Sequence, residues 1–185
     1  MENGSEAMRG IGILIMVGVA IGTGFYAAQK IRERLEVLTV LCQMVHHLMG
    51  RILQVNEALP QALQEVGQRF LETQEGKRMV PAKMFLQVAG RLNRERRLRF
   101  SEIWNEEIQK LTGEIAIRKE DIRNLEELGA FLGYSDRKMQ EKTLQFYLEQ
   151  TQDVIEELKA EIHTKTKLYR SLGMAAGIFL FVFLI

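Results

Sequence analysis

Cys42 and His46 are the side chains whose types and spacing come nearest to chemistry. They lie four positions apart, so on a helix they would share one face and could supply half of the ligands of a zinc site. His47 and His163 do not provide a second pair with ligand spacing, and the chain has a single cysteine. We therefore expect Cys42 to pack in an apolar seam with His46 beside it, and we predict no metal and no cofactor.

Other catalytic patterns do not stand out either. The sequence has no nucleophile beside a base, no Walker loop and no distinct carboxylate pair. Residues 22–27, GTGFYA, formally match a dinucleotide fingerprint, but no strand–turn–helix unit surrounds them. We expect a protein that is not an enzyme. The lone cysteine excludes an intramolecular disulfide and fits a reducing compartment.

The segment RLNRERRLR, residues 91–99, concentrates positive charge. One interpretation is a solvated helix end and connector. The other is a contact for an acidic protein face or for anionic lipid headgroups, because arginine binds carboxylates and phosphates through paired hydrogen bonds. No interleaved aromatic residues accompany the run, and a basic first half of the chain is balanced by an acidic second half, so we expect no nucleic-acid binding. The candidate contact residues are Arg94, Arg96, Arg97 and Arg99.

The elements that carry these residues are predicted to be helices throughout. Helix-forming residues dominate the 185 positions, there are two prolines, and no run alternates β-branched and polar residues. An apolar seam with 4-3-4-3 spacing follows residues 31–52, and a second seam follows residues 148–169. We expect these two long helices to run antiparallel and to pair. Shorter helices between them bring the total to about six.

Both ends of the chain are strongly apolar. Residues 11–28 would form a helix about 27 Å long, close to the thickness of a bilayer core. A cleaved signal peptide is the alternative, but no basic segment precedes the stretch. Residues 172–185 are fewer, but counting from Leu168 gives a similar length; a helix buried in a soluble core is the alternative there. We interpret both stretches as membrane anchors.

Charge predicts how the anchors are oriented. Basic residues follow the first stretch and precede the second, which places the body in the cytoplasm and both termini across the membrane. These flanking residues are Lys30, Arg32, Arg34, Lys165, Lys167 and Arg170. The predicted division is a short N-terminal segment over 1–10, a transmembrane helix over 11–28, a cytoplasmic helical domain over 29–170 and a transmembrane helix over 171–185. In the anchors, Gly18 with Gly22 and Gly173 with Gly177 have the spacing that lets membrane helices pack closely.

Turn chemistry predicts where the shorter helices begin and end. Asn56 can cap a helix that runs to about residue 72, and Pro81 suits the first turn of another that runs to about residue 92. Ser101 can cap a helix that Gly113 closes. A fifth helix is expected over about 119–132.

The connection after the fifth helix, LGYSDRKM, is the most specific in its chemistry. Gly133 is expected in a left-handed conformation at the end of the fifth helix, and Ser135 is expected to cap the last helix. Gly129 would let the fifth helix approach a neighbour closely, and Asp136 would place negative charge at the positive end of the last helix. We expect structural roles here; a partner-binding surface is the alternative.

Three segments between the apolar ends are distinctive: NEALPQALQEV, FSEIWNEEI and LEELGAFLGYSDRKMQEKTLQFYLEQ. The most specific motif comprises Leu128, Gly129, Leu132, Gly133, Asp136 and Gln140. With these segments and its apolar ends, the chain resembles over nearly its whole length the stage III sporulation protein AB family of endospore-forming bacteria. The N-terminal MENGSEA departs from the family pattern and makes Met8 a candidate start.

The resemblance implies a helical bundle like the cytoplasmic F domain of type II secretion and type IV pilus platform proteins. It further implies a place in the mother-cell membrane around the forespore, within the channel that links the two cells. The implied partners are a cytoplasmic secretion-type ATPase and other membrane subunits of the complex, and homo-oligomers are compatible with it. The hypothesis is a non-catalytic platform or adaptor subunit. The alternative is a membrane-tethered helical signalling protein or one that binds anionic lipid surfaces.

Overall fold

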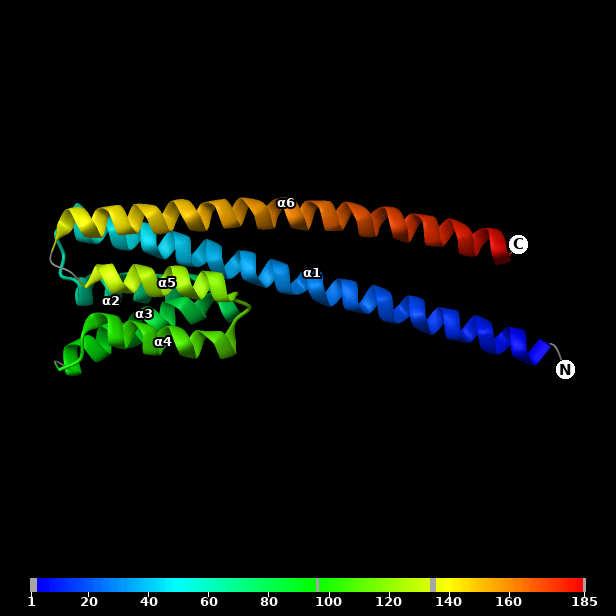
Figure 1. The fold of residues 1–185 in the computed structure, drawn as a ribbon, viewed down its shortest axis with the longest axis horizontal. Helices are drawn as coiled ribbons and strands as arrows, with labels where there is room; N and C mark the ends of the chain where they lie inside the picture. Colours follow the sequence, from blue (N-terminus) through cyan, green and yellow to red (C-terminus); the bar gives the residue numbers. More distant parts are fainter. Residues whose placement is uncertain (1–2, 96, 134–135, 185) are drawn as a thin grey trace. The chain divides into compact units, whose positions relative to one another are not determined.

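The computed structural model describes the backbone of residues 3–95, 97–133 and 136–184, and the side chains of residues 26, 28–95, 97–133 and 136–168. Within these residues the chain forms six α-helices, one 3₁₀ helix and no strand (Figure 1). The elements are α1 (Asn3–Leu53), α2 (Leu59–Thr73), η1 (Gly76–Arg78), α3 (Met79–Arg94), α4 (Phe100–Glu114), α5 (Lys119–Leu132) and α6 (Arg137–Leu184). The all-α class and the six helices predicted from the sequence are confirmed.

The chain divides into two units. One unit contains Met1–Arg32 and Ile162–Ile185, and the other, which we call the body, is Glu33–Glu161. In the part of the chain whose side chains are described, no helix is both long enough and apolar enough to cross a bilayer. The predicted anchors lie almost entirely outside the residues whose side chains are described, and so do their glycine pairs Gly18–Gly22 and Gly173–Gly177. Membrane anchoring therefore stays a prediction.

The core of the body takes buried apolar side chains from all six α-helices. The largest fully buried residues include Leu41, Leu63, Phe85, Trp104, Leu125 and Leu144. Helices α2, α3, α4 and α5 pack in sequence, each against the next. Within the body α6 runs antiparallel to α1, as predicted, and Arg137 at the start of α6 donates hydrogen bonds to the carbonyls of Ile52 and Leu53 at the end of α1. Within the body, α1 and α6 thus close one core.

The apolar face of α1 is turned from the predicted seam. Cys42 and Met49, which the seam included, are only partly buried, whereas Leu41 and Leu48, the residues just before them, are fully buried. The reason is that α1 has more than one neighbour: it contacts α2 through the His47–Phe70 ring pair and lies beside α6 on another side. The predicted seam between two long helices therefore accounts for only part of the buried face of α1.

Two predicted helix caps are wrong. Asn56 does not cap α2: it has a φ of 60°, the left-handed region, and it follows the end of α1, where Gln54 and Val55 donate to the carbonyl of Gly50. The chain turns there before α2 begins at Leu59, with Pro60 in its first turn. Asparagine tolerates the left-handed region better than most residues, and this is the use the fold makes of it.

Helix α4 also begins earlier and ends later than predicted. Ser101 lies inside the helix, whose N-cap is Arg99; the carboxylate of Glu102 accepts a hydrogen bond from the Arg99 amide at 2.8 Å. The helix continues through Gly113 to Glu114, and its C-cap is the buried Ile115. By contrast, Pro81 lies in the first turn of α3 and α5 spans Lys119–Leu132, both as predicted.

Candidate functional site

The motif at the α5–α6 connection is built around Gly129. A Cβ at this position would overlap the indole ring of Trp104 on α4, lying 2.5 Å from its Nε1 and 2.6 Å from its Cγ. The same indole donates a buried hydrogen bond from Nε1 to the carbonyl of Leu125 at 2.7 Å. Leu128 and Leu132 point into the same core and are buried. The predicted close approach at Gly129 is confirmed, and α4 is the neighbour.

Gly133 does not have the predicted left-handed conformation. It is the C-cap of α5 with φ −74° and ψ −7°, which any residue can adopt. Its small size still matters, because a Cβ there would lie 3.1 Å from the Cβ of Phe100. Tyr134 and the predicted cap Ser135 lie outside the described residues.

Asp136 and Gln140 hold the two helices together at this corner. The Asp136 carboxylate accepts a hydrogen bond from the Lys138 amide at 3.0 Å, and its carbonyl accepts one from the Gln140 amide, so Asp136 caps α6. The Gln140 side chain reaches back to the carbonyl of Leu132 at the end of α5, at 2.9 Å. These contacts join the end of α5 to the start of α6.

The run of arginines divides into one paired residue and an exposed group. Arg91 forms ion pairs with Glu95, Glu106 and Glu107 at 2.9, 2.6 and 2.9 Å, and these carboxylates, Glu95 first, raise its pKa. Arg91 therefore joins α3 to α4. The exposed group, which we call the arginine corner, comprises Arg94, Arg97, Leu98 and Arg99. Arg96, also predicted as a contact, lies outside the described residues.

The arginine corner lies at one end of the body. Helix α3 begins beside the start of α1 in the body, where Lys77 and Arg78 pair with Glu33 and Glu36 at 2.8 and 3.0 Å. It then runs the length of the body, so its last residue, Arg94, lies at the other end (Figure 1). Arg97 and Arg99 form no ion pair with any described residue. The corner thus presents free cations beside the exposed Leu98 at the end of the body away from Glu33.

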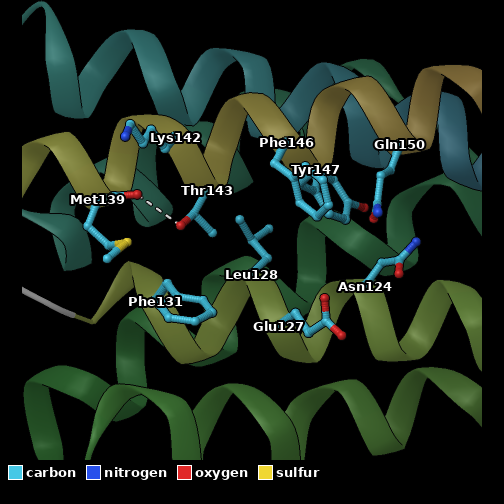
Figure 2. A pocket seen from close by; sticks show the side chains of 10 residues that line it. All are labelled: Asn124, Glu127, Leu128, Phe131, Met139, Lys142, Thr143, Phe146, Tyr147 and Gln150. Carbon is cyan, nitrogen blue, oxygen red and sulfur yellow. Dashed lines mark hydrogen bonds between the residues drawn. The ribbon is translucent and has the colours of Figure 1, made fainter.

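A groove between α5 and α6 is a feature that the sequence analysis missed. Ten residues line it: Asn124, Glu127, Leu128 and Phe131 from α5, and Met139, Lys142, Thr143, Phe146, Tyr147 and Gln150 from α6. Its volume is about 370 Å³. Figure 2 shows Phe131 and Leu128 on one side and Met139, Thr143 and Phe146 on the other. Phe131, Met139 and Phe146 are 42%, 43% and 54% exposed, so this α5–α6 groove is an open apolar surface.

The spacing of apolar residues along α6 indicated the groove. Met139 and Phe146 are seven positions apart and lie off the buried row of Leu144, Tyr147 and Thr151. Two large apolar residues on a second face of one helix indicate a second apolar surface. The match of Phe131 to that surface depends on the packing of α5, which the sequence pattern did not reveal.

A buried ion pair was also missed. Arg34 on α1 donates from Nε and one Nη to the two carboxylate oxygens of Asp121 on α5, both at 2.8 Å, and the two residues are 6% and 4% exposed. The Asp121 carboxylate also accepts a hydrogen bond from the Arg118 amide at the start of α5. The hydrogen bond to Asp121 raises the pKa of Arg34, while burial opposes the rise. Arg34 was counted among the cations that flank a membrane segment, but it pairs inside the body instead.

The Cys42–His46 pair lies beside a shallow pocket that α6 lines with Leu148, Glu149, Gln152 and Asp153. Burial raises the pKa of the Cys42 thiol, and burial followed by the charges of Arg69 and His46 lowers the pKa of His47. Among the described residues no three side chains of metal-binding type come together as a set of ligands.

The fold of the described residues places the protein in the class of all-helical bundles, and its body has an open apolar groove and an exposed arginine corner. The sequence model of the family described as stage III sporulation protein AB matches residues 9–185, and the chain therefore belongs to this family. Membership supports a role in sporulation.

A solved structure supports the fold. The structure described as "Stage III sporulation protein AB (SpoIIIAB)" superposes with a TM-score of 0.61 and 18% sequence identity, covering 71% of this chain and 97% of the other. At that identity the likeness concerns the fold alone. A search of curated proteins found no match.

Proposed function

We propose that this chain is a non-catalytic platform or adaptor subunit of a secretion-like channel complex between mother cell and forespore. The observation that carries the proposal is the family match over residues 9–185, which includes both apolar ends as well as the body. The all-α body suits the F-domain likeness that the sequence suggested. In this proposal the apolar ends anchor the chain in the mother-cell membrane around the forespore, and the body lies in the cytoplasm.

The proposed partner is a cytoplasmic secretion-type ATPase, and its proposed docking surface is the arginine corner. Arg97 and Arg99 are exposed cations without an ion pair among the described residues, and Leu98 between them is 38% exposed. An apolar side chain with arginines on both sides suits a partner surface that offers an apolar recess with an acidic rim.

The test is binding of the full-length chain, purified in mild detergent, to the ATPase encoded with it. The double variant Arg97→Glu/Arg99→Glu should weaken binding at least about tenfold, because two attractive contacts become repulsive. Lys83→Glu, a charge reversal at an exposed position on α3, is the matched control and should bind as the parent does. Equal binding by parent and double variant would exclude the corner as the docking surface. No binding by the parent would exclude the ATPase as a direct partner.

A second measurement separates the lipid alternative. Vesicles that contain anionic phosphatidylserine should recruit the parent and the Arg97→Glu/Arg99→Glu variant equally if the corner serves a protein. Loss of vesicle binding in the double variant alone would favour the lipid-surface function instead. The membrane arrangement has its own test: a reporter active only in the cytoplasm should work inside the body and fail when fused after Ile185.

A further inference from the structure

The α5–α6 groove has a charged residue on each rim. Glu127 lies on the α5 rim and Lys142 on the α6 rim, and both line the groove. Both side chains are exposed, and neither forms an ion pair with another described residue. The two rims therefore carry opposite unpaired charges beside an open apolar floor.

The register of the two helices fixes the positions of these charges along the groove. Helices α5 and α6 run antiparallel, and the Gln140 side chain bonds the carbonyl of Leu132, so residues whose numbers sum to about 272 lie level with each other. Glu127 is level with residue 145, which is three residues, or about 4.5 Å, from Lys142.

We propose that the α5–α6 groove is covered by the same groove of a second copy of this chain, related by a two-fold axis along the groove. Such an axis places the α5 rim of one copy over the α6 rim of the other. Glu127 of one copy then faces Lys142 of the other within reach of their side chains. The two charges have opposite signs, and the pair forms twice.

The apolar floor matches under the same operation. Phe131 is level with residue 141, so it comes to lie on Met139 of the other copy, and a thioether against an aromatic ring is a favourable contact. Phe146 is level with residue 126 and comes to lie beside Leu128 of the other copy. The three exposed apolar side chains of the groove are therefore covered together.

The direction of the axis suits a membrane protein. A two-fold axis parallel to α6 leaves the α6 helices of both copies pointing the same way, so both chains leave their bodies on the same side. An axis across the groove would make the two α6 helices antiparallel and would place each rim on its own counterpart. The charge pattern and the chain direction thus favour the same arrangement, which holds whether or not the chain also binds an ATPase.

The experiment is a charge swap in the full-length chain purified in mild detergent, with the monomer–dimer equilibrium measured by sedimentation over a range of concentrations. The parent should dimerise reversibly. Glu127→Lys and Lys142→Glu should each raise the dimer dissociation constant about tenfold or more, because two symmetry-related attractions become repulsions. The double variant Glu127→Lys/Lys142→Glu should restore the dimer. Phe146→Ser should abolish it.

Controls separate the groove from other effects. Lys159→Glu reverses an exposed charge on α6 that lies on another face of the helix than Met139 and Phe146, and it should leave the dimer unchanged. The fluorescence of Trp104, the only tryptophan, reports whether each variant is folded. A parent that stays monomeric would overturn the proposal. So would a dimer that is insensitive to the single swaps, or a double swap that fails to restore it, since either result would place the contact elsewhere.

Discussion

Replacing Gly129 by alanine tests the tightest contact of the body. The added Cβ would overlap the Trp104 indole, lying 2.5 Å from Nε1, and would push the ring from the Leu125 carbonyl. Overpacking of this kind costs about 1–3 kcal/mol. Leaving the buried Trp104 Nε1–H without its acceptor costs about 1–3 kcal/mol more. Alanine favours the helix by at most about 1 kcal/mol, so the free energy of unfolding should fall by about 2–4 kcal/mol.

The assay uses the only tryptophan of the chain. Urea unfolding of the full-length protein in detergent, followed by Trp104 fluorescence, reports on the body without interference from other indoles. The Gly129→Ala variant should unfold at lower urea, and its native emission should shift to the red as the ring loses its buried position. On heating, the midpoint should fall by roughly 5–15 °C for a chain of this size.

A matched substitution makes this prediction sharp. Gly113 is also helical, but a Cβ there would meet no atom within 4 Å, so Gly113→Ala should be neutral or stabilise the body by up to about 1 kcal/mol. The same chemical change should thus act with opposite sign at the two positions. If Gly129→Ala were as stable as Gly113→Ala and kept the emission of the parent, the close packing of α4 on α5 described above would be wrong.

Three further predictions follow from the contacts of the body. Asp121→Asn should lower the free energy of unfolding by about 3–5 kcal/mol, because it leaves Arg34 buried without a counter-charge. Arg34→Met/Asp121→Leu should recover most of that loss in the same urea assay. If Asp121→Asn lowered the free energy by less than about 1 kcal/mol, the buried pair would be contradicted. Gln140→Ala should lower the free energy of unfolding by about 0.5–1.5 kcal/mol, because it removes the donor to the Leu132 carbonyl. Lys138→Ala, a change at an exposed neighbour, should leave the free energy of unfolding almost unchanged. Equal effects of the two variants would show that this bond does not hold the α5–α6 connection. Cys42 should react with iodoacetamide at pH 7 more slowly than a free cysteine, because its raised pKa leaves less thiolate. Unfolding in urea should remove this difference in rate. A rate that does not change on unfolding would mean that burial does not protect the thiol.

The sequence predicted those parts of the fold that depend on local chemistry. The bounds of α5, the position of Pro81 and the close approach at Gly129 all agree with the structure, because periodicity, a fixed backbone angle and a missing side chain act within a few residues. The predicted caps at Asn56 and Ser101 failed because each residue type has more than one use. Asn56 serves a left-handed turn, and Glu102 takes over the capping of α4.

What the sequence could not supply were contacts between distant segments. Arg34 and Asp121 are 87 residues apart, and each alone looks like a solvated charge. The α5–α6 groove likewise depends on how two faces meet after packing, so Phe131 and Phe146 could not be paired from their own helices. In the arginine run, Arg91 differs from its neighbours because it forms ion pairs with three carboxylates. Two of these carboxylates lie on the next helix, α4.

The first and the last helix, α1 and α6, both contribute to the core of the body, and this has a consequence for synthesis on the ribosome. At translation rates of about 5–20 residues per second, Asp121 is made roughly 4–17 s after Arg34, and the start of α6 follows later still. During that time the broad apolar face of α1 has no α6 to cover it, and Arg34 has no counter-ion. The body therefore matures late, when most of its length has already left the exit tunnel, and the nascent chain is a natural client for chaperones that shield apolar helices.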